Sequence, residues 1–178
     1  EANGLVACWS SPILSREGSV LGTFALYPEE KSRPGARELD LVALATDLAA
    51  VAIARYQEES ALRESEARFR RLFEVAPLPL CLINADGSLG GLNRSYIETF
   101  GYTHEDVPNL SVMWPLAYPD PEYRDWVIRT WSAAVSKANA THSAVEPLEV
   151  RVTCKNGEVR TVMASGAAVG DSTLVTFF

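Results

Sequence analysis

Three of the four tryptophans, Trp114, Trp126 and Trp131, lie within a short stretch of the sequence. Burying an indole ring contributes about 2–3 kcal/mol, and its N–H group then needs a hydrogen-bond partner. Aromatic side chains at this density can line a pocket for a planar ligand or chromophore. They can also fill a core and leave little void, and this packing role is the interpretation that we favour.

Two polar residues could complete such a pocket. Asn93 offers an amide and Tyr96 a hydroxyl, a small polar set of the kind that orients ligands in an apolar wall. Asn93 also precedes the helical stretch Arg94–Phe100, and capping that helix is its favoured role. Strand alternation and helix spacing give the full set of candidate ligand-binding residues. The set is Asn93, Tyr96, Phe100, Met113, Trp114, Trp126, Trp131, Val152 and Cys154.

The other titratable residues show no catalytic pattern. His104 lies in Thr103–Asp106, a predicted helix start in which Thr103 is the cap. Asp120 and Glu122 flank a proline in a predicted surface turn. The sequence contains no phospho-accepting histidine motif, no GGDEF motif and no Gly-rich ATP-binding box. We therefore expect no catalytic residues in this chain.

Cysteine spacing and charge exclude several further classes of site and partner. Cys8, Cys81 and Cys154 lack the CxxC or Cys/His spacing of a metal site or redox pair, and isolated cysteines fit a reducing cytoplasm. A net charge of −7 argues against nucleic-acid binding. The longest apolar-rich run, Leu39–Ile53, contains two aspartates and is too short to span a bilayer. We expect a cytoplasmic location, without nucleic-acid or membrane contact.

Short strands must position the candidate residues. The C-terminal part reads as two strands, a run of short helices and a three-stranded meander. Alternation and helix spacing predict that Leu80, Leu82 and Leu116 face the core. Asn156-Gly157 predicts a two-residue type I′ turn in which both residues have positive φ. The predicted strands are Leu80–Ile83, Leu89–Leu92, Glu149–Cys154, Glu158–Ala168 and Ser172–Phe178.

This order resembles the PAS domain family, and two stretches carry the resemblance. "FRRLFEVAPLPLCLINADGSLGGLNRSYIETFGYTHEDV" contains the first two strands and Asn93, and "EVRVTCKNGEVRTVMASGA" contains the later hairpin. The resemblance implies an α+β fold, in which a five-stranded antiparallel sheet and short helices enclose a small cavity. It also implies sensing and signal relay rather than catalysis.

The cofactors of known PAS proteins can be compared with this sequence residue by residue. Flavin-adduct photoreceptors carry a cysteine in the stretch that corresponds to Asn109–Trp114, which here contains none. Haem-binding members carry a histidine on the long helix before the third strand, and Pro121–Asn139 contains none. The resemblance therefore predicts no cofactor, although an unknown small molecule could still bind.

The first part of the chain resembles the C-terminal part of a GAF domain, on the string "ACWSSPILSREGSVLGTFALYPEEKSRPGARELDLVALATDLAAVAIAR". We expect strands at Leu5–Trp9 and Val20–Tyr27 and then a closing helix. Bilin-binding relatives place a histidine beside their attachment cysteine, but here Trp9 follows Cys8, so no bilin is expected. The predicted domains are residues 1–56 for the partial GAF segment, 57–74 for a linker helix and 75–178 for the PAS domain.

A single connector helix is predicted over Glu38–Phe73, which contains no Gly or Pro. Its apolar residues form a broken heptad pattern that can make a parallel two-stranded coiled coil. The alternative is a solvated connector whose last residues only cap the PAS core. We expect a homodimer formed through this helix, with the GAF segment helping to bury its apolar face. The apolar residues of the pattern are Leu48, Ala52, Leu62, Phe69 and Phe73.

The chain is thus predicted to be the sensory region of a bacterial signal-transduction protein, in which a small ligand or other cue in the PAS pocket alters a dimeric helix. The sequence begins with Glu and ends in a predicted strand, so a longer polypeptide is expected. Its output domain is expected to be a histidine kinase of a two-component system, with a diguanylate cyclase as the next choice. The alternatives are a ligand-free dimerisation module and, more distantly, a flavin-based redox or light sensor.

Overall fold

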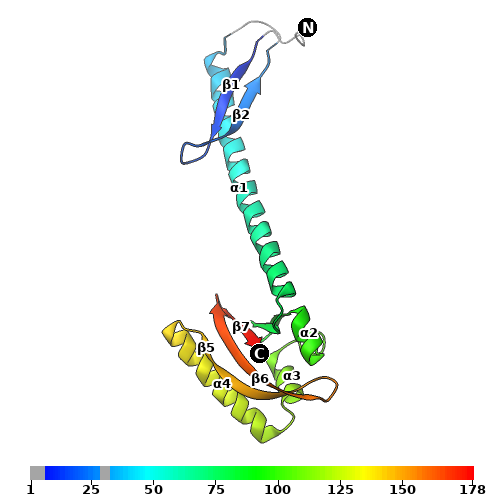
Figure 1. The fold of residues 1–178 in the computed structure, drawn as a ribbon. Coiled ribbons are helices and arrows are strands. Elements are labelled where there is room, and N and C mark those ends of the chain that lie inside the picture. Colours follow the sequence, from blue (N-terminus) through cyan, green and yellow to red (C-terminus); the bar gives the residue numbers. More distant parts are fainter. Residues whose placement is uncertain (1–6, 29–32) are drawn as a thin grey trace. The chain divides into compact units, whose positions relative to one another are not determined.

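The structure is a computed structural model that describes residues 7–28 and 33–178. The chain divides into two units, Glu1–Ala67 and Arg68–Phe178, and most of their elements are labelled in Figure 1. One long helix carries the chain from the first unit into the second. The domain boundaries drawn from the sequence at residues 56 and 74 both fall on this helix and stay predictions.

The first unit begins with an antiparallel hairpin. Strand β1 (Trp9–Leu14) pairs with β2 (Val20–Leu26). The prediction of a strand at Leu5–Trp9 is wrong for residues 7 and 8, which precede β1, and residues 5 and 6 lie outside the described residues. The strand instead continues through Pro12, because proline is tolerated in an edge strand.

Helix α1 (Ala36–Val75) follows the hairpin and confirms the predicted connector helix. At its start, the backbone N–H of Gly35 donates to the carboxylate of Glu38, a capping arrangement that satisfies an otherwise free donor. Pro77 follows its last turn, since proline cannot continue the hydrogen-bond ladder. The helix buries Thr46, whereas most of its large apolar side chains are exposed.

The second unit is built on a five-stranded antiparallel sheet, as predicted. The strand order is β4-β3-β7-β6-β5, so the last strand lies in the middle of the sheet and joins the β3–β4 hairpin to the β5–β6 hairpin. The helices between β4 and β5 pack against one face of the sheet and form the core with it. The elements are β3 (Leu80–Ile83), β4 (Leu89–Leu92), α2 (Arg94–Phe100), α3 (Leu110–Ala117), α4 (Pro121–Thr141), β5 (Val145–Thr153), β6 (Val159–Val169) and β7 (Ser172–Phe177).

Three hairpins share one kind of turn, with a glycine at the same place. Gly18, Gly87 and Gly157 have φ values of 83°, 80° and 86°, a region that favours glycine. In the β5–β6 hairpin, the N–H of Gly157 donates to the carbonyl of Cys154 at 2.9 Å. The loop therefore has three residues. Lys155 and Asn156 form the turn, and Gly157 follows in the left-handed conformation. The hairpin is confirmed, but the predicted type I′ turn is wrong because φ of Asn156 is not positive.

The core of the second unit uses the opposite face of β3 from the one predicted. Cys81 is 2% exposed and belongs to the core, whereas Leu80 and Leu82 lie on the other face and are only half-buried. All four residues of this strand are apolar, so alternation alone does not show which pair faces inward. Leu116 and Trp126 were also predicted to face inward, and both are 42% exposed.

The segment Thr103–Asp106 forms a single turn and not the predicted start of a helix. The carboxylate of Asp106 closes the turn by accepting hydrogen bonds from the N–H and hydroxyl of Thr103, both at 2.9 Å. The same carboxylate pairs with Nζ of Lys155 at 2.7 Å and so joins the turn to the β5–β6 loop. The prediction fails because the chain leaves the helical path after one turn.

Candidate ligand pocket

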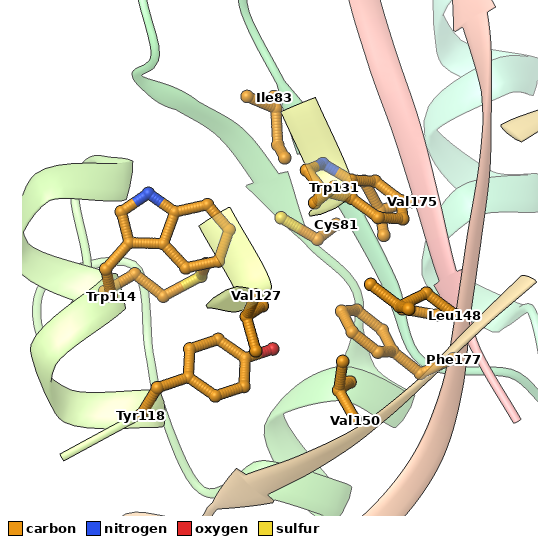
Figure 2. Close-up of a pocket in the computed structure, with 12 residues that line it drawn as sticks. Cys81, Ile83, Trp114, Tyr118, Val127, Trp131, Leu148, Val150, Val175 and Phe177 are labelled. Carbon is orange, nitrogen blue, oxygen red and sulfur yellow. The ribbon is translucent and has the colours of Figure 1, made fainter. Parts of the chain in front are cut away.

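A small cavity lies between the helices and the sheet in the second unit. Its volume is about 30 Å³, and Figure 2 shows the side chains that surround it. Strands β3, β5, β6 and β7 supply one wall, and helices α3 and α4, with the residue that follows α3, supply the other. The lining residues are Cys81, Ile83, Met113, Trp114, Tyr118, Val127, Trp131, Leu148, Val150, Ala164, Val175 and Phe177.

Helix caps fix the wall that the helices form. Asn109 caps α3 and Asp120 caps α4, each through a side-chain oxygen that accepts a backbone N–H group. Val127 and Trp131 are four residues apart, so both project from the same face of α4. Met113 of α3 is buried and completes this wall. The capping residues that fix the position of these lining side chains therefore lie outside the cavity itself.

The cavity wall is apolar and uncharged. None of the twelve lining residues carries a charge at neutral pH. Burial raises the pKa of the Cys81 thiol to about 12. Burial, and to a lesser extent the neighbouring Tyr123, raises the pKa of the Tyr118 hydroxyl well above its usual range. Both groups therefore stay protonated and neutral at physiological pH.

The hydroxyl of Tyr118 differs from those of the other core tyrosines. Tyr102 donates to the carbonyl of Thr153 at 3.0 Å, and Tyr96 donates weakly to the sulfur of Met113 at 3.8 Å. Within the part of the chain that the structure describes, the Tyr118 hydroxyl has no hydrogen-bond partner. The side chain is only 5% exposed, and Figure 2 shows its oxygen directed among the lining side chains. Among the described residues the one fully buried side-chain oxygen without a partner is Oγ1 of Thr176, so the unpaired oxygen of Tyr118 keeps access to open space. It is a free polar group that faces the cavity.

The structure brings three of the predicted ligand-binding residues to the cavity: Met113, Trp114 and Trp131. Tyr96 and Phe100 do not line it. Their rings pack against the lining residue Phe177, with centroids 5.8 and 5.2 Å from its ring. These two residues therefore support the wall from behind.

The remaining predicted residues lie further away. Trp126 is 42% exposed and stacks on Tyr123 with ring centroids 5.5 Å apart. Val152 is buried beyond the cavity on β5, and the thiol of Cys154 contacts the carbonyl of Thr99 at 3.7 Å. None of these side chains lines the cavity.

Asn93 also lies outside the lining and joins three segments. Its Oδ1 accepts from the N–H groups of Leu80 at 2.8 Å and Tyr96 at 2.9 Å. Its Nδ2 donates to the carbonyls of Phe73 at 3.1 Å and Leu78 at 2.9 Å. The predicted capping role is confirmed, and the same fully buried side chain also ties the end of α1 to β3 and α2.

The other nine lining residues were not among the predicted ligand-binding residues: Cys81, Ile83, Tyr118, Val127, Leu148, Val150, Ala164, Val175 and Phe177. Cys81 and Ile83 were missed because β3 turns toward the core the face opposite to the one predicted. Tyr118 sits between the end of α3 and the cap of α4, where neither the helical nor the strand period applies. The sequence feature that could have identified Tyr118 is its position next to Pro119 and Asp120, since these residues indicate a short, fixed connection between two helices.

Between residues 7–28 and 33–178, no group of three or more His, Cys, Asp or Glu side chains is placed to hold a metal ion. The three cysteines are free thiols. Among the helices in these ranges, none combines the length and apolar character of a membrane span.

Comparison with known proteins agrees with this geometry. Residues 67–134 match the family model of the PAS domain. The methyl sulfide methyltransferase-associated sensor of Methanosarcina acetivorans is 38% identical over 108 residues. That match covers 60% of this chain and 11% of the sensor, so the chain corresponds to a small part of this relative.

Solved structures share the fold at low identity. The Rhodobacter sphaeroides LOV protein has a TM-score of 0.51 at 17% identity, over 65% of this chain and 66% of that one. A PAS domain from Colwellia psychrerythraea has a TM-score of 0.50 at 14% identity, over 63% and 93%. The E. coli DhaR(N)-DhaL complex has a TM-score of 0.56 at 12% identity, over 96% and 54%. These matches do not identify the first unit as a GAF domain, which stays a prediction.

Proposed function

The second unit of this chain is a PAS domain, and on this premise we propose that its cavity binds a small molecule and that binding alters the end of helix α1. PAS sensor domains are generally non-catalytic, and the name of the curated relative also describes a sensor. The observation that carries the proposal is the apolar cavity between helices and sheet, into which a free hydroxyl points.

The contacts of Asn93 support a route from the cavity to α1. Cys81 lines the cavity, and its neighbour Leu80 donates its N–H to Asn93. The same Asn93 side chain donates to the carbonyl of Phe73 in the last turns of α1. A ligand that shifts β3 would therefore also shift Asn93 and the end of α1. If the helix end has two positions in equilibrium, ligand binding in the cavity would change how often each is occupied.

A ligand-free structural module is the second candidate. The small volume of the cavity favours it, because a well-packed core tolerates a void of this size without a ligand. The two candidates differ in one expectation. A sensor must change outside the cavity when the cavity is filled, and a scaffold need not.

We also propose that two copies of the chain pair through α1. Seven of its apolar side chains are between 48% and 63% exposed and follow the alternating spacing of three and four residues that defines a coiled-coil seam. Thr46, which is buried, lies on the opposite side of the helix. The seam differs from the predicted pattern, since Phe73 is half-buried in the second unit. The seam residues are Leu41, Leu44, Leu48, Val51, Leu62, Phe69 and Leu72.

For the whole polypeptide, we propose a cytoplasmic sensor that controls an output domain. A histidine kinase of a bacterial two-component system comes first and a diguanylate cyclase second, on the PAS resemblance. The three free thiols support the cytoplasmic location. Phosphotransfer and nucleotide cyclisation assays on the complete polypeptide would distinguish the two outputs.

Filling the cavity from within tests the sensory proposal without a known ligand. Ala164→Leu places a larger side chain in the cavity, and Ala167→Leu makes the same change on an exposed part of the same strand. We expect Ala164→Leu to alter hydrogen exchange at the amides of Leu80 and Tyr96, which bond to Asn93, and Ala167→Leu to leave them unchanged. Changes confined to the immediate neighbours of Ala164 would favour the ligand-free scaffold.

A further inference from the structure

We infer that the cavity selects a small, uncharged molecule with a single polar atom, which accepts a hydrogen bond from the hydroxyl of Tyr118. This inference rests on the proposed sensory function and names the class of ligand that the cavity would take. Three independent properties of the cavity lead to it: its size, its lack of charge and the free hydroxyl of Tyr118 that points into it.

The size of the cavity limits the ligand to a few atoms. A volume of about 30 Å³ compares with the roughly 10–15 Å³ that one water requires on the same scale. The space therefore admits roughly two water-sized groups, and a molecule of about three non-hydrogen atoms fits with small side-chain adjustments. A flavin or a haem would require the helices and the sheet to move apart.

The chemistry of the wall excludes ionised ligands. A charge that enters an apolar site loses its hydration, and no lining residue could compensate it. The titratable groups of the wall, Cys81 and Tyr118, are neutral at physiological pH because both are buried. Neither carboxylates nor ammonium groups would bind, whereas alcohols, thioethers and small ketones meet this requirement.

The hydroxyl of Tyr118 supplies the polar contact. The ring that carries it packs against two others, with centroids 5.7 Å from the ring of Trp114 and 6.1 Å from that of Tyr123. The backbone around it is also fixed, since the carbonyl of Tyr118 accepts from the guanidinium of Arg124 at 2.9 Å. A donor that is pre-positioned in an apolar wall can orient a ligand at little entropic cost.

Three probes of equal size test the charge requirement, and toluene, which is larger, tests the size limit. Ethanol, propane and ethylammonium each have three non-hydrogen atoms and differ in having a hydroxyl, a methyl or a charged group at one end. Binding can be followed by NMR at the indole N–H groups of Trp114 and Trp131, which line the cavity, with exposed Trp126 as internal reference. We expect ethanol and propane to shift the two cavity signals and ethylammonium and toluene to leave them unchanged.

A single-atom substitution tests the hydrogen bond. Tyr118→Phe should weaken the binding of ethanol about 3- to 10-fold, the range expected for one hydrogen bond, and leave the affinity for propane unchanged. Tyr56→Phe makes the same chemical change at a 71% exposed residue and should affect neither probe. Because both substitutions remove only one oxygen, the variants should fold like the parent chain.

The outcomes separate the two levels of the proposal. Binding of ethylammonium or toluene, or equal effects of Tyr118→Phe on ethanol and propane, would overturn the ligand class while leaving a binding pocket. If no probe shifts the cavity signals and Ala164→Leu has no effect at Leu80 or Tyr96, the sensory proposal itself fails.

Discussion

Asn93 lies where the end of α1 meets β3 and α2, and its amide satisfies backbone groups that those elements leave unpaired. The first N–H groups of a helix and its last carbonyls have no partner inside that helix. Asn93 accepts from the N–H of Tyr96 at the start of α2 and donates to the carbonyl of Phe73 near the end of α1. No apolar side chain of similar size can replace both kinds of bond.

Replacing this amide should therefore be costly. Asn93→Leu removes the hydrogen bonds of a side chain that is 0% exposed, and we expect the free energy of unfolding to fall by about 3 kcal/mol or more. Asn109→Ala also removes an N-cap, but from a site near the surface, and should cost about 1 kcal/mol. Urea denaturation of both variants measures the difference. Equal losses would show that Asn93 acts only as a cap.

Asp106 should show the clearest dependence on pH. The hydrogen bond from Lys155, with further bonds from Thr103, lowers the pKa of its carboxyl from 3.8 to about 2. A pKa that is lower in the folded state stabilises the fold above the ordinary pKa, and this stabilisation is lost as pH falls from about 4 to about 2. An NMR titration of the Asp106 carboxyl carbon measures this value directly.

The origin of that shift can be tested by removing the ammonium group. Lys155→Met should raise the pKa of Asp106 toward its ordinary value, although the bonds from Thr103 remain. Lys137→Met removes a different surface ion pair, with Glu146, and should leave Asp106 unchanged. An unchanged Asp106 in Lys155→Met would mean that the turn at Thr103 alone sets its pKa.

The candidate site could be predicted from the sequence only in part. Trp131 was found because a large aromatic residue in a helix next to a sheet is usually buried. Trp126 was misplaced because five residues correspond to about 140° of rotation on a helix, so Trp126 and Trp131 cannot share a face. Val127, four residues from Trp131, lies on the face that lines the cavity. Helical spacing, applied strictly from Trp131, excludes Trp126 from the cavity wall and selects Val127.

At the scale of elements, the loop at Gly157 shows what the turn chemistry requires. Gly157 has φ of 86°, with nothing near the position that a Cβ would occupy, so the cost of a side chain is conformational and not steric. We expect Gly157→Ala to lower the free energy of unfolding by about 1–2 kcal/mol and Gly157→Asn by less, because asparagine tolerates this region. Thermal denaturation of the two variants provides the comparison. Similar losses would indicate that the glycine has a different role.

The strands and short helices were predictable where punctuation residues mark both of their ends. Leu80–Ile83, Leu89–Leu92 and Arg94–Phe100 agree with the structure because Gly87 and Asn93 separate them. The strand β1 was misplaced because Pro12 suggested an ending that an edge strand does not require. Local chemistry predicts where elements end, but which strand lies at an edge depends on the whole sheet.

At the scale of the whole molecule, the exposed seam of α1 is the feature that a single chain does not explain. Leu48 and Val51 are 63% and 62% exposed, an unfavourable arrangement in water. Arg55 and Glu58 take the next two positions of the same spacing and interrupt the seam. A stagger of one heptad between two parallel helices would place Arg55 against Leu48 or Leu62, which is unfavourable, and Glu58 against Val51 or Ser65. In the unstaggered register each of them would face its own copy, so the pairing would rest on the apolar positions on either side of them.

The seam makes a testable prediction about association. Leu48→Glu should weaken the dimer at least tenfold, or about 1.4 kcal/mol, because it places like charges at facing positions of the seam. Ser60→Glu adds the same charge on the opposite side of the helix and should leave association unchanged. Sedimentation equilibrium gives the dissociation constants. A parent chain that stays monomeric at high micromolar concentration would contradict the proposal.

The orientation of the two helices can be decided by cross-linking at Ser65, another position of the seam. In a parallel, unstaggered pair, position 65 faces its own copy, so Ser65→Cys should form a disulfide between the chains. In an antiparallel pair in which Leu41 of each helix faces Leu72 of the other, position 65 faces Leu48 instead, and no such disulfide forms. Cys8 is exposed and must first be replaced by serine, so that it does not form a cross-link of its own. Only the parallel arrangement brings both copies of α1 to their PAS domains at the same end, as the proposed shared output would require.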